Sequence, residues 1–311
     1  MLKEICITPQ IFDKSQLIDK LLWKDTKSLL EAISLGGYIV GLNNSDWKKI
    51  VRVKINEIDN NKVKDLFNTL ITILDKRNLI VGHPKDNNIS PKTEDEWINI
   101  AYKLNSIYKF YSILATKSYN NINTTIEELE YININEKFGI TGSKHSIKTE
   151  EELEKIFIPI LLYAKKVIII DPYFDIEKPR YKTTLNIIAK FFKNRRGIKD
   201  GGTIYINCSS KIYPSSNWKD IINKIYQDYG HIVIINIWER QKDNIKMHDR
   251  YIITNQIGII SASGTDKDLY QQSEWAIKDY TTLDDILQQY KENSSPFKLK
   301  YIVTSTDIEN K

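Results

Sequence analysis

Six residues between positions 248 and 274 carry side chains that can bind or cleave a phosphate ester. His248 offers an imidazole, a nucleophile that can attack phosphorus and leave again. Arg250 offers a guanidinium, which stays charged and can donate hydrogen bonds to two phosphate oxygens. The other positions supply an amide, two hydroxyls and a carboxylate: Asn255, Ser263, Thr265 and Glu274. The alternative is a structural ion pair of Asp249 with Arg250 or a nearby lysine, beside a half-buried His248.

The spacing of these residues resembles the signature of the phospholipase D superfamily, H-x-K-x4-D-x6-G-S-x-N. His248 stands at the histidine position, Arg250 replaces the lysine, and Asn255 replaces the aspartate and lacks its charge. The block 262–265 reads Ala-Ser-Gly-Thr, and Glu274 stands where nuclease-like members carry a downstream glutamate. The sequence Asp171-Pro172-Tyr173 is also similar to the end of the first strand in bacterial members. The resemblance covers the second half of the chain and says nothing about the first.

The resemblance implies a metal-independent phosphodiesterase that needs no cofactor and passes through a phosphohistidine. A second histidine would protonate the leaving oxygen and later activate water. Donors on Arg250, Ser263 and Thr265 would stabilise the charge of the transition state. Glu274 would accept a hydrogen bond from the nucleophilic imidazole and set its tautomer.

Two such motifs normally build one site, but this chain contains only one. His83-Pro84-Lys85 repeats the H-x-K spacing without the rest of the motif, and His145 and His231 lack a basic residue two positions on. We therefore expect the second catalytic histidine to be His248 of another copy of the chain, on a two-fold axis. The sequence predicts a homodimer.

Positive charge is concentrated in the segment that leads up to this motif. The whole chain has a net charge of +5, whereas residues 178–250 alone hold 15 Lys/Arg against 6 Asp/Glu. A basic helix and its exit loop can neutralise several phosphates. The candidate nucleic-acid-binding residues are Lys190, Lys193, Arg195, Arg196 and Lys199. A solvated helix end is the alternative, because cations also suit a helix C-terminus.

Nucleic acid, either DNA or RNA, is the expected partner, because this half is basic and shows no clear docking surface for lipid. Trp218, Trp238 and Trp275 can stack on bases, although tryptophan in such elements is more often part of the core. The rival function is a catalytically inactive phospholipase D-like module that binds nucleic acid or a partner protein. By resemblance, single-motif bacterial members often accompany restriction or anti-phage systems, which suggests an operon-encoded protein partner.

The elements that must position the motif indicate an α/β fold. From residue 150 onwards, β-branched runs alternate with helix-period segments, which predicts an α/β/α phospholipase D-like domain with a mixed sheet. The run 167–170 predicts a buried strand that ends at Asp171, where α/β proteins often place ligands. Two further strands are predicted over 247–254 and 257–261, on either side of the turn at Asn255.

The first half predicts a smaller N-terminal domain that is mixed α/β or mainly helical. Thr93 and Glu96 form a capping box at the start of a helix predicted over 94–117. The polar stretch 118–148 predicts a linker, so we expect domains over 1–140 and 141–311. We find no metal-ligand spacing in this half and assign it no chemical role. The predicted elements are strands at 5–8 and 38–42 and helices at 15–35 and 62–77.

Cysteine usage and hydropathy indicate a cytoplasmic protein without a membrane anchor. Cys6 and Cys208 match no zinc spacing and form no disulfide framework, which favours a reducing compartment. The first residues contain no apolar core of signal-peptide length. No stretch reaches the roughly 18 apolar residues that a membrane span requires.

Overall fold

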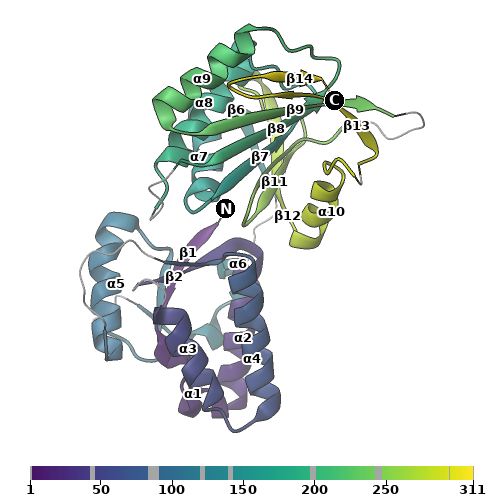
Figure 1. Cartoon of the computed structure of the whole chain (residues 1–311). Coiled ribbons are helices and arrows are strands. Elements are labelled where there is room, and N and C mark those ends of the chain that lie inside the picture. The colour runs from purple at the N-terminus through teal and green to yellow at the C-terminus, as the bar shows by residue number, and fades with distance from the viewer. Residues whose placement is uncertain are drawn as a thin grey trace. The chain divides into compact units, whose positions relative to one another are not determined.

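Both halves of the chain are α/β, so the predicted fold class is confirmed (Figure 1). The chain divides into two compact units, unit 1 (Met1–Thr141) and unit 2 (Gly142–Lys311). The computed structural model describes residues 2–42, 46–82, 91–119, 123–138, 143–196, 201–241, 247–293 and 295–310.

Unit 1 is built on a parallel five-stranded sheet with the order β3-β2-β1-β4-β5. This half is therefore mixed α/β, with its main helices longer than the short strands of its sheet. The strands are β1 (Lys3–Ile7), β2 (Gly37–Gly41), β3 (Ile80–Gly82), β4 (Ser112–Ala115) and β5 (Thr124–Thr125). The helices are η1 (Pro9–Phe12), α1 (Lys14–Ile18), α2 (Lys20–Gly36), α3 (Asp46–Asn56), α4 (Asn61–Lys76), α5 (Glu94–Tyr108), η2 (Glu127–Tyr131) and α6 (Ile134–Phe138).

Two predicted helices of unit 1 end or break earlier than their apolar periodicity indicates. The helix expected over 15–35 is interrupted at Asp19, whose carboxylate accepts hydrogen bonds from two amides of the first turn of α2. The capping box of α5 is present, but the backbone of Lys109 adopts the left-handed region (φ 52°) and ends the helix. The residues that follow form β4, so the predicted helix over 94–117 is wrong in its last third.

Unit 2 contains a mixed nine-stranded sheet with the order β14-β13-β9-β8-β7-β10-β11-β12-β6. The three central strands β7, β8 and β9 are parallel, and the other pairs are antiparallel. The strands are β6 (Ser143–Lys148), β7 (Lys166–Ile170), β8 (Thr203–Ser209), β9 (Ile232–Arg240), β10 (Tyr251–Thr254), β11 (Gly258–Ser261), β12 (Asp268–Lys278), β13 (Phe297–Val303) and β14 (Ile308–Asn310). The helices are α7 (Glu150–Leu161), α8 (Pro179–Lys193), α9 (Asn217–Tyr229) and α10 (Tyr280–Gln288).

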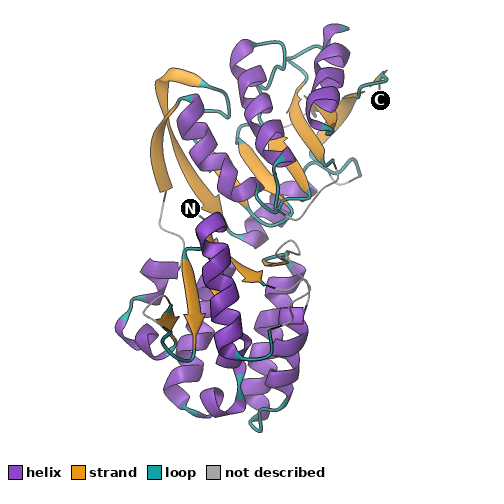
Figure 2. Ribbon diagram, turned by 90° about the vertical axis from the view of Figure 1, so that its left-hand side faces the viewer, coloured by secondary structure: helices purple, strands orange, loops and turns teal. Residues whose placement is uncertain are grey.

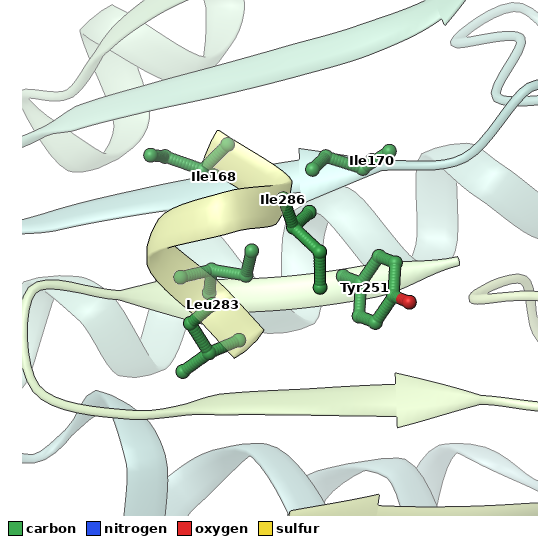
Figure 3. Close-up of a cluster of buried hydrophobic side chains, with 6 residues drawn as sticks. Ile168, Ile170, Tyr251, Leu283 and Ile286 are labelled. Carbon is green, nitrogen blue, oxygen red and sulfur yellow. The ribbon is translucent and has the colours of Figure 1, made fainter. Parts of the chain in front are cut away.

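Helices cover both faces of this sheet. The helices α7, α8 and α9 lie side by side on one face, as Figures 1 and 2 show from two directions. The short helix α10 covers the other face, where Leu283 and Ile286 pack against Ile168, Ile170 and Tyr251 (Figure 3). The central strands are therefore buried on both sides, which explains their β-branched runs.

Three further sequence expectations need correction. The linker predicted over 118–148 contains β5, η2, α6 and the edge strand β6. The strand predicted over 247–254 begins only at Tyr251, which leaves His248 and Arg250 in the segment before it. The sequence analysis assigns no elements after β11, although the structure contains β12, α10, β13 and β14 there.

Cys6 and Cys208 are both buried and free. Among the described helices, none combines the length and the apolarity that a membrane crossing needs.

Candidate functional site

A pocket opens at the carboxyl ends of the three parallel strands of unit 2. Strand β10 is antiparallel to β7, so its first residues reach the same edge of the sheet. Ligand sites in open α/β sheets gather at this edge. The pocket has a volume of about 160 Å³, and we name it the His248 pocket. Its lining residues are Pro172, Tyr173, Ser209, Lys211, Trp238, Arg240, Met247, His248 and Phe297.

The floor of the His248 pocket is aromatic and firmly held. Trp238 lies near the end of β9, and its indole nitrogen donates a hydrogen bond of 2.9 Å to the amide oxygen of Asn207. Tyr290 packs edge-on against Trp238 and stacks on Phe297, with ring centroids 5.9 and 5.8 Å apart respectively. Trp238 and Phe297 are each only 3% exposed, and Trp218 and Trp275 are buried as well. Trp238 and Phe297 therefore back the pocket from the core, while Tyr173, which is 48% exposed, supplies its accessible ring.

The rim of the His248 pocket is cationic. The His248 side chain is 78% exposed, and its Nδ1 lies 3.7 Å from a carboxylate oxygen of Asp249. The hydroxyl of Tyr251 donates to the other oxygen of Asp249 at 3.2 Å. Lys211 and Arg240 are exposed and form no ion pair with another described residue. An anion at the mouth of the pocket would therefore meet three groups that can donate hydrogen bonds.

Arg250 lies beside this rim and is anchored by other parts of the protein. Its Nη1 donates to the carbonyl of Ala262 at 3.2 Å, and its Nε lies 3.9 Å from a carboxylate oxygen of Asp171. Its guanidinium carbon lies over the ring of Tyr173, 5.4 Å from the centroid. The Arg250 side chain is 18% exposed, so part of the guanidinium remains accessible.

Asp171 contacts residues from both ends of the motif, Arg250 and Thr265. Its side chain is completely buried at the end of β7. One oxygen accepts hydrogen bonds from the backbone nitrogen (3.0 Å) and the hydroxyl (2.8 Å) of Thr265. The other accepts from the backbone nitrogen of Tyr173 at 3.0 Å. Thr265 is itself fully buried, so its hydroxyl positions Asp171 and is not available to a phosphate. This corrects the role predicted for Thr265.

A second buried network fixes the loop 262–267. The ammonium of Lys148, which comes from β6, lies 2.9 Å from a carboxylate oxygen of Asp266, and both side chains are buried. It also contacts the carbonyl of Ser263 at 3.3 Å and the amide oxygen of Gln271 at 3.0 Å. Arg180 approaches the second oxygen of Asp266 at 3.3 Å. Sequence reasoning missed Lys148, because a lysine in a short polar strand resembles a surface residue.

The other predicted catalytic side chains have different roles in this structure. The hydroxyl of Ser263 donates to the carbonyl of Gln272 at 3.0 Å, which engages it within the loop. Glu274 is exposed on β12, two strands and roughly 10 Å sideways from β10, and no hydrogen bond joins it to His248. Asn255 lies at the opposite end of β10, where its oxygen accepts from the backbone nitrogen of Lys165 at 2.7 Å. Asn255 therefore links the turn between β10 and β11 to the segment that precedes β7.

The predicted nucleic-acid-binding cluster lies at the opposite end of the sheet from the His248 pocket, because α8 runs back along the parallel strands. Arg195 is buried, donates to the carbonyl of Ala164 at 2.7 Å and stacks on Phe192. Lys190 pairs with Glu154, and Lys193 donates to the carbonyl of Asp228. The backbone nitrogen of Arg196 donates to the carbonyl of Leu162. Lys199 lies outside the described residues. The structure therefore gives Arg195 a structural role, whereas Lys190 and Lys193 remain exposed at the surface.

Neither His145 nor His231 can serve as a second histidine in the same copy. His145 lies on the edge strand β6, three strands from β10. His231 lies at the far end of the sheet, where its Nδ1 accepts from the backbone nitrogen of Gly202 and its Nε2 contacts the carbonyl of Ala189. Burial lowers the pKa of His231 to about 4. His83 lies outside the described residues.

No family model and no curated protein matches the chain. Among solved structures, the chain is similar to TrmBL2, an archaeal chromatin protein whose structure shows a novel mode of DNA binding. The two chains are 12% identical, the match covers 78% of this chain and 85% of that one, and the TM-score is 0.29. The functional inference therefore depends on the His248 pocket and its surroundings.

Proposed function

We propose that unit 2 is a phospholipase D-like phosphodiesterase domain that binds nucleic acid at the His248 pocket and hydrolyses it without a metal ion. The observation that carries this proposal is the exposed imidazole of His248 on a cationic rim, next to Lys211 and Arg240. An accessible nucleophile beside fixed positive charge is what attack on a phosphodiester requires.

The chemistry takes two steps. The Nδ1 atom of His248 faces Asp249, which leaves Nε2 to attack phosphorus. A P–N bond forms, the bond to the leaving oxygen breaks, and a second histidine gives that oxygen a proton. Water then attacks phosphorus, the P–N bond breaks, and the second histidine takes a proton from the water. Both histidines return to their starting states.

The second histidine is proposed to come from another copy of the chain. The pocket holds one described histidine, and the His248 side chain is 78% exposed, which leaves it accessible to a second copy of the chain. A two-fold axis through the rim would place two identical imidazoles on either side of one phosphorus. Hydrolysis would then require the homodimer.

A second candidate function is binding without hydrolysis. It is favoured by the internal bonding of Arg250, Ser263 and Thr265, each of which already has a protein partner. A phosphate would then bind to Lys211, Arg240 and His248 and be released unchanged.

A cleavage assay with a matched histidine control separates the two functions. The chain is incubated in EDTA with labelled DNA and RNA, beside His248→Ala and His145→Ala. Cleavage that survives chelation, disappears in His248→Ala and persists in His145→Ala supports the phosphodiesterase. Binding without cleavage in all three proteins supports the second function. Sedimentation at the assay concentration tests the dimer, since a fully active monomer contradicts the shared site.

A further inference from the structure

We infer that the His248 pocket takes one unpaired base of a single-stranded nucleic acid, while the cationic rim holds the phosphate next to that base. This inference rests on the proposed function in one respect, that the ligand is a nucleic acid. It adds a specific substrate form, because a base inside a duplex is stacked and paired and must leave the duplex before it can enter a pocket.

The size of the pocket fits a single ring system. Its volume is about 160 Å³, and an engineered apolar protein cavity of about 150 Å³ binds one benzene molecule. A duplex is far too large for this space. One base of a flexible strand can enter it while the backbone stays outside.

The surfaces around the pocket suit a planar, aromatic guest. Trp238 and Phe297 form a rigid apolar backing to the pocket, each only 3% exposed, and the hydrogen bond from Trp238 to Asn207 fixes the indole, so the ring available for stacking is that of Tyr173. The guanidinium of Arg250 lies over one face of the Tyr173 ring, and Tyr173 remains 48% exposed. Stacking one base on an aromatic side chain strengthens binding by about 5- to 150-fold.

The charge around the pocket favours a nucleotide over a lipid headgroup. Lys211 and Arg240 form no ion pair with another described residue and stand beside His248 on the rim. These cations attract a phosphate and repel the ammonium of a zwitterionic headgroup. An aromatic floor below a cationic rim matches the order of groups in a nucleotide, a base next to its phosphate.

Equilibrium binding to four probes tests the inference on the full chain. The probes are a labelled single-stranded oligonucleotide, its duplex, the same backbone without bases, and vesicles of anionic phospholipid. The variants are Tyr173→Ala, Tyr173→Phe, which keeps the ring, and Tyr270→Ala, which removes a tyrosine that is 97% exposed on β12. Thermal melting of each variant checks that it folds.

We expect the single strand to bind at least about tenfold more tightly than the duplex or the abasic backbone. Tyr173→Ala should lose that preference, whereas Tyr173→Phe and Tyr270→Ala should keep it. Equal affinity for the single strand and the abasic backbone would overturn the base pocket, and so would preferential binding to vesicles. If the duplex is bound and cleaved as well as the single strand, the base pocket fails while the phosphodiesterase stands. If no nucleic acid binds at all, both fail.

Discussion

The buried carboxylate of Asp171 should be the main anchor of the candidate site, and Asp171→Asn tests this with little change in shape. The carboxylate accepts three hydrogen bonds, from the backbone nitrogens of Tyr173 and Thr265 and from the Thr265 hydroxyl. It also faces Nε of Arg250 at 3.9 Å. An amide keeps one acceptor oxygen and turns the other position into a donor.

The cost of this change follows from the geometry. Whichever way the new amide is turned, one buried backbone N–H loses its acceptor, which costs about 1–3 kcal/mol. The bonds that remain lose their charge assistance, worth about 1 kcal/mol each. Arg250, whose side chain is 18% exposed, loses the carboxylate that lies 3.9 Å from its Nε. The sum agrees with the 3–5 kcal/mol typical of breaking a buried ion pair, so we expect unit 2 to lose about 3–5 kcal/mol of unfolding free energy.

Denaturant unfolding followed by circular dichroism measures the loss, and hydrogen exchange read by mass spectrometry locates it. Exchange should accelerate in β10, β11 and the loop 262–267. The control is Asp284→Asn on the exposed side of α10, which should change stability by less than about 0.5 kcal/mol. A loss below about 1 kcal/mol in Asp171→Asn would mean that the carboxylate does not hold the motif together.

Three further predictions concern buried charged or titratable groups. Burial lowers the pKa of His231 from its ordinary value of 6.5 to about 4, so between these two pH values the unfolded chain binds a proton that the folded chain does not. The stability of unit 2 should therefore fall by about 3 kcal/mol between pH 7 and 4. Urea unfolding should show a smaller acid-induced loss in a folded His231→Gln variant. Lys148→Met leaves the carboxylate of Asp266 buried without its ammonium and should cost about 3–5 kcal/mol, whereas adding Asp266→Leu should restore part of the melting temperature. Arg195→Ala should lower stability by about 2 kcal/mol, since it removes a buried charged hydrogen bond, and should leave the salt dependence of nucleic-acid binding unchanged in a filter-binding titration.

The strands at the centre of each sheet could be predicted because both of their faces are buried. Such strands are continuous apolar runs, as in 167–170, and a run of this kind has few alternatives. The edge strand β6 has the opposite character, since its sequence Ser-Lys-His-Ser-Ile-Lys is mostly polar. It is held by its pairing with β12 and by the ion pair of Lys148 with Asp266, 118 residues away, and local periodicity carries no sign of such contacts.

The candidate site was predictable in its position and less so in its roles. The spacing from His248 to Thr265 requires a strand, a turn and a second strand, and the structure contains β10, a turn at Asn255, and β11. Residue type alone does not say whether a hydroxyl faces a ligand or a buried carboxylate. Thr265 could be assigned only once Asp171 was seen 2.8 Å from its hydroxyl.

The protein hydrogen bonds of Arg250 and Thr265 differ in how strongly they oppose contact with a phosphate. For Arg250 to meet a phosphate with its Nε still beside Asp171, its Nη1 must release the hydrogen bond to the carbonyl of Ala262, which costs about 1 kcal/mol, and a charge-assisted bond to phosphate returns more than that. For Thr265 to do the same, its hydroxyl would have to leave the completely buried carboxylate of Asp171, and because Thr265 is itself fully buried, the backbone would also have to move to bring the hydroxyl to a phosphate. Arg250 can therefore join Lys211 and Arg240 in holding a phosphate, whereas Thr265 stays structural in either candidate function. Hydrolysis and binding without hydrolysis therefore differ in one requirement, which is that a second imidazole reaches the rim.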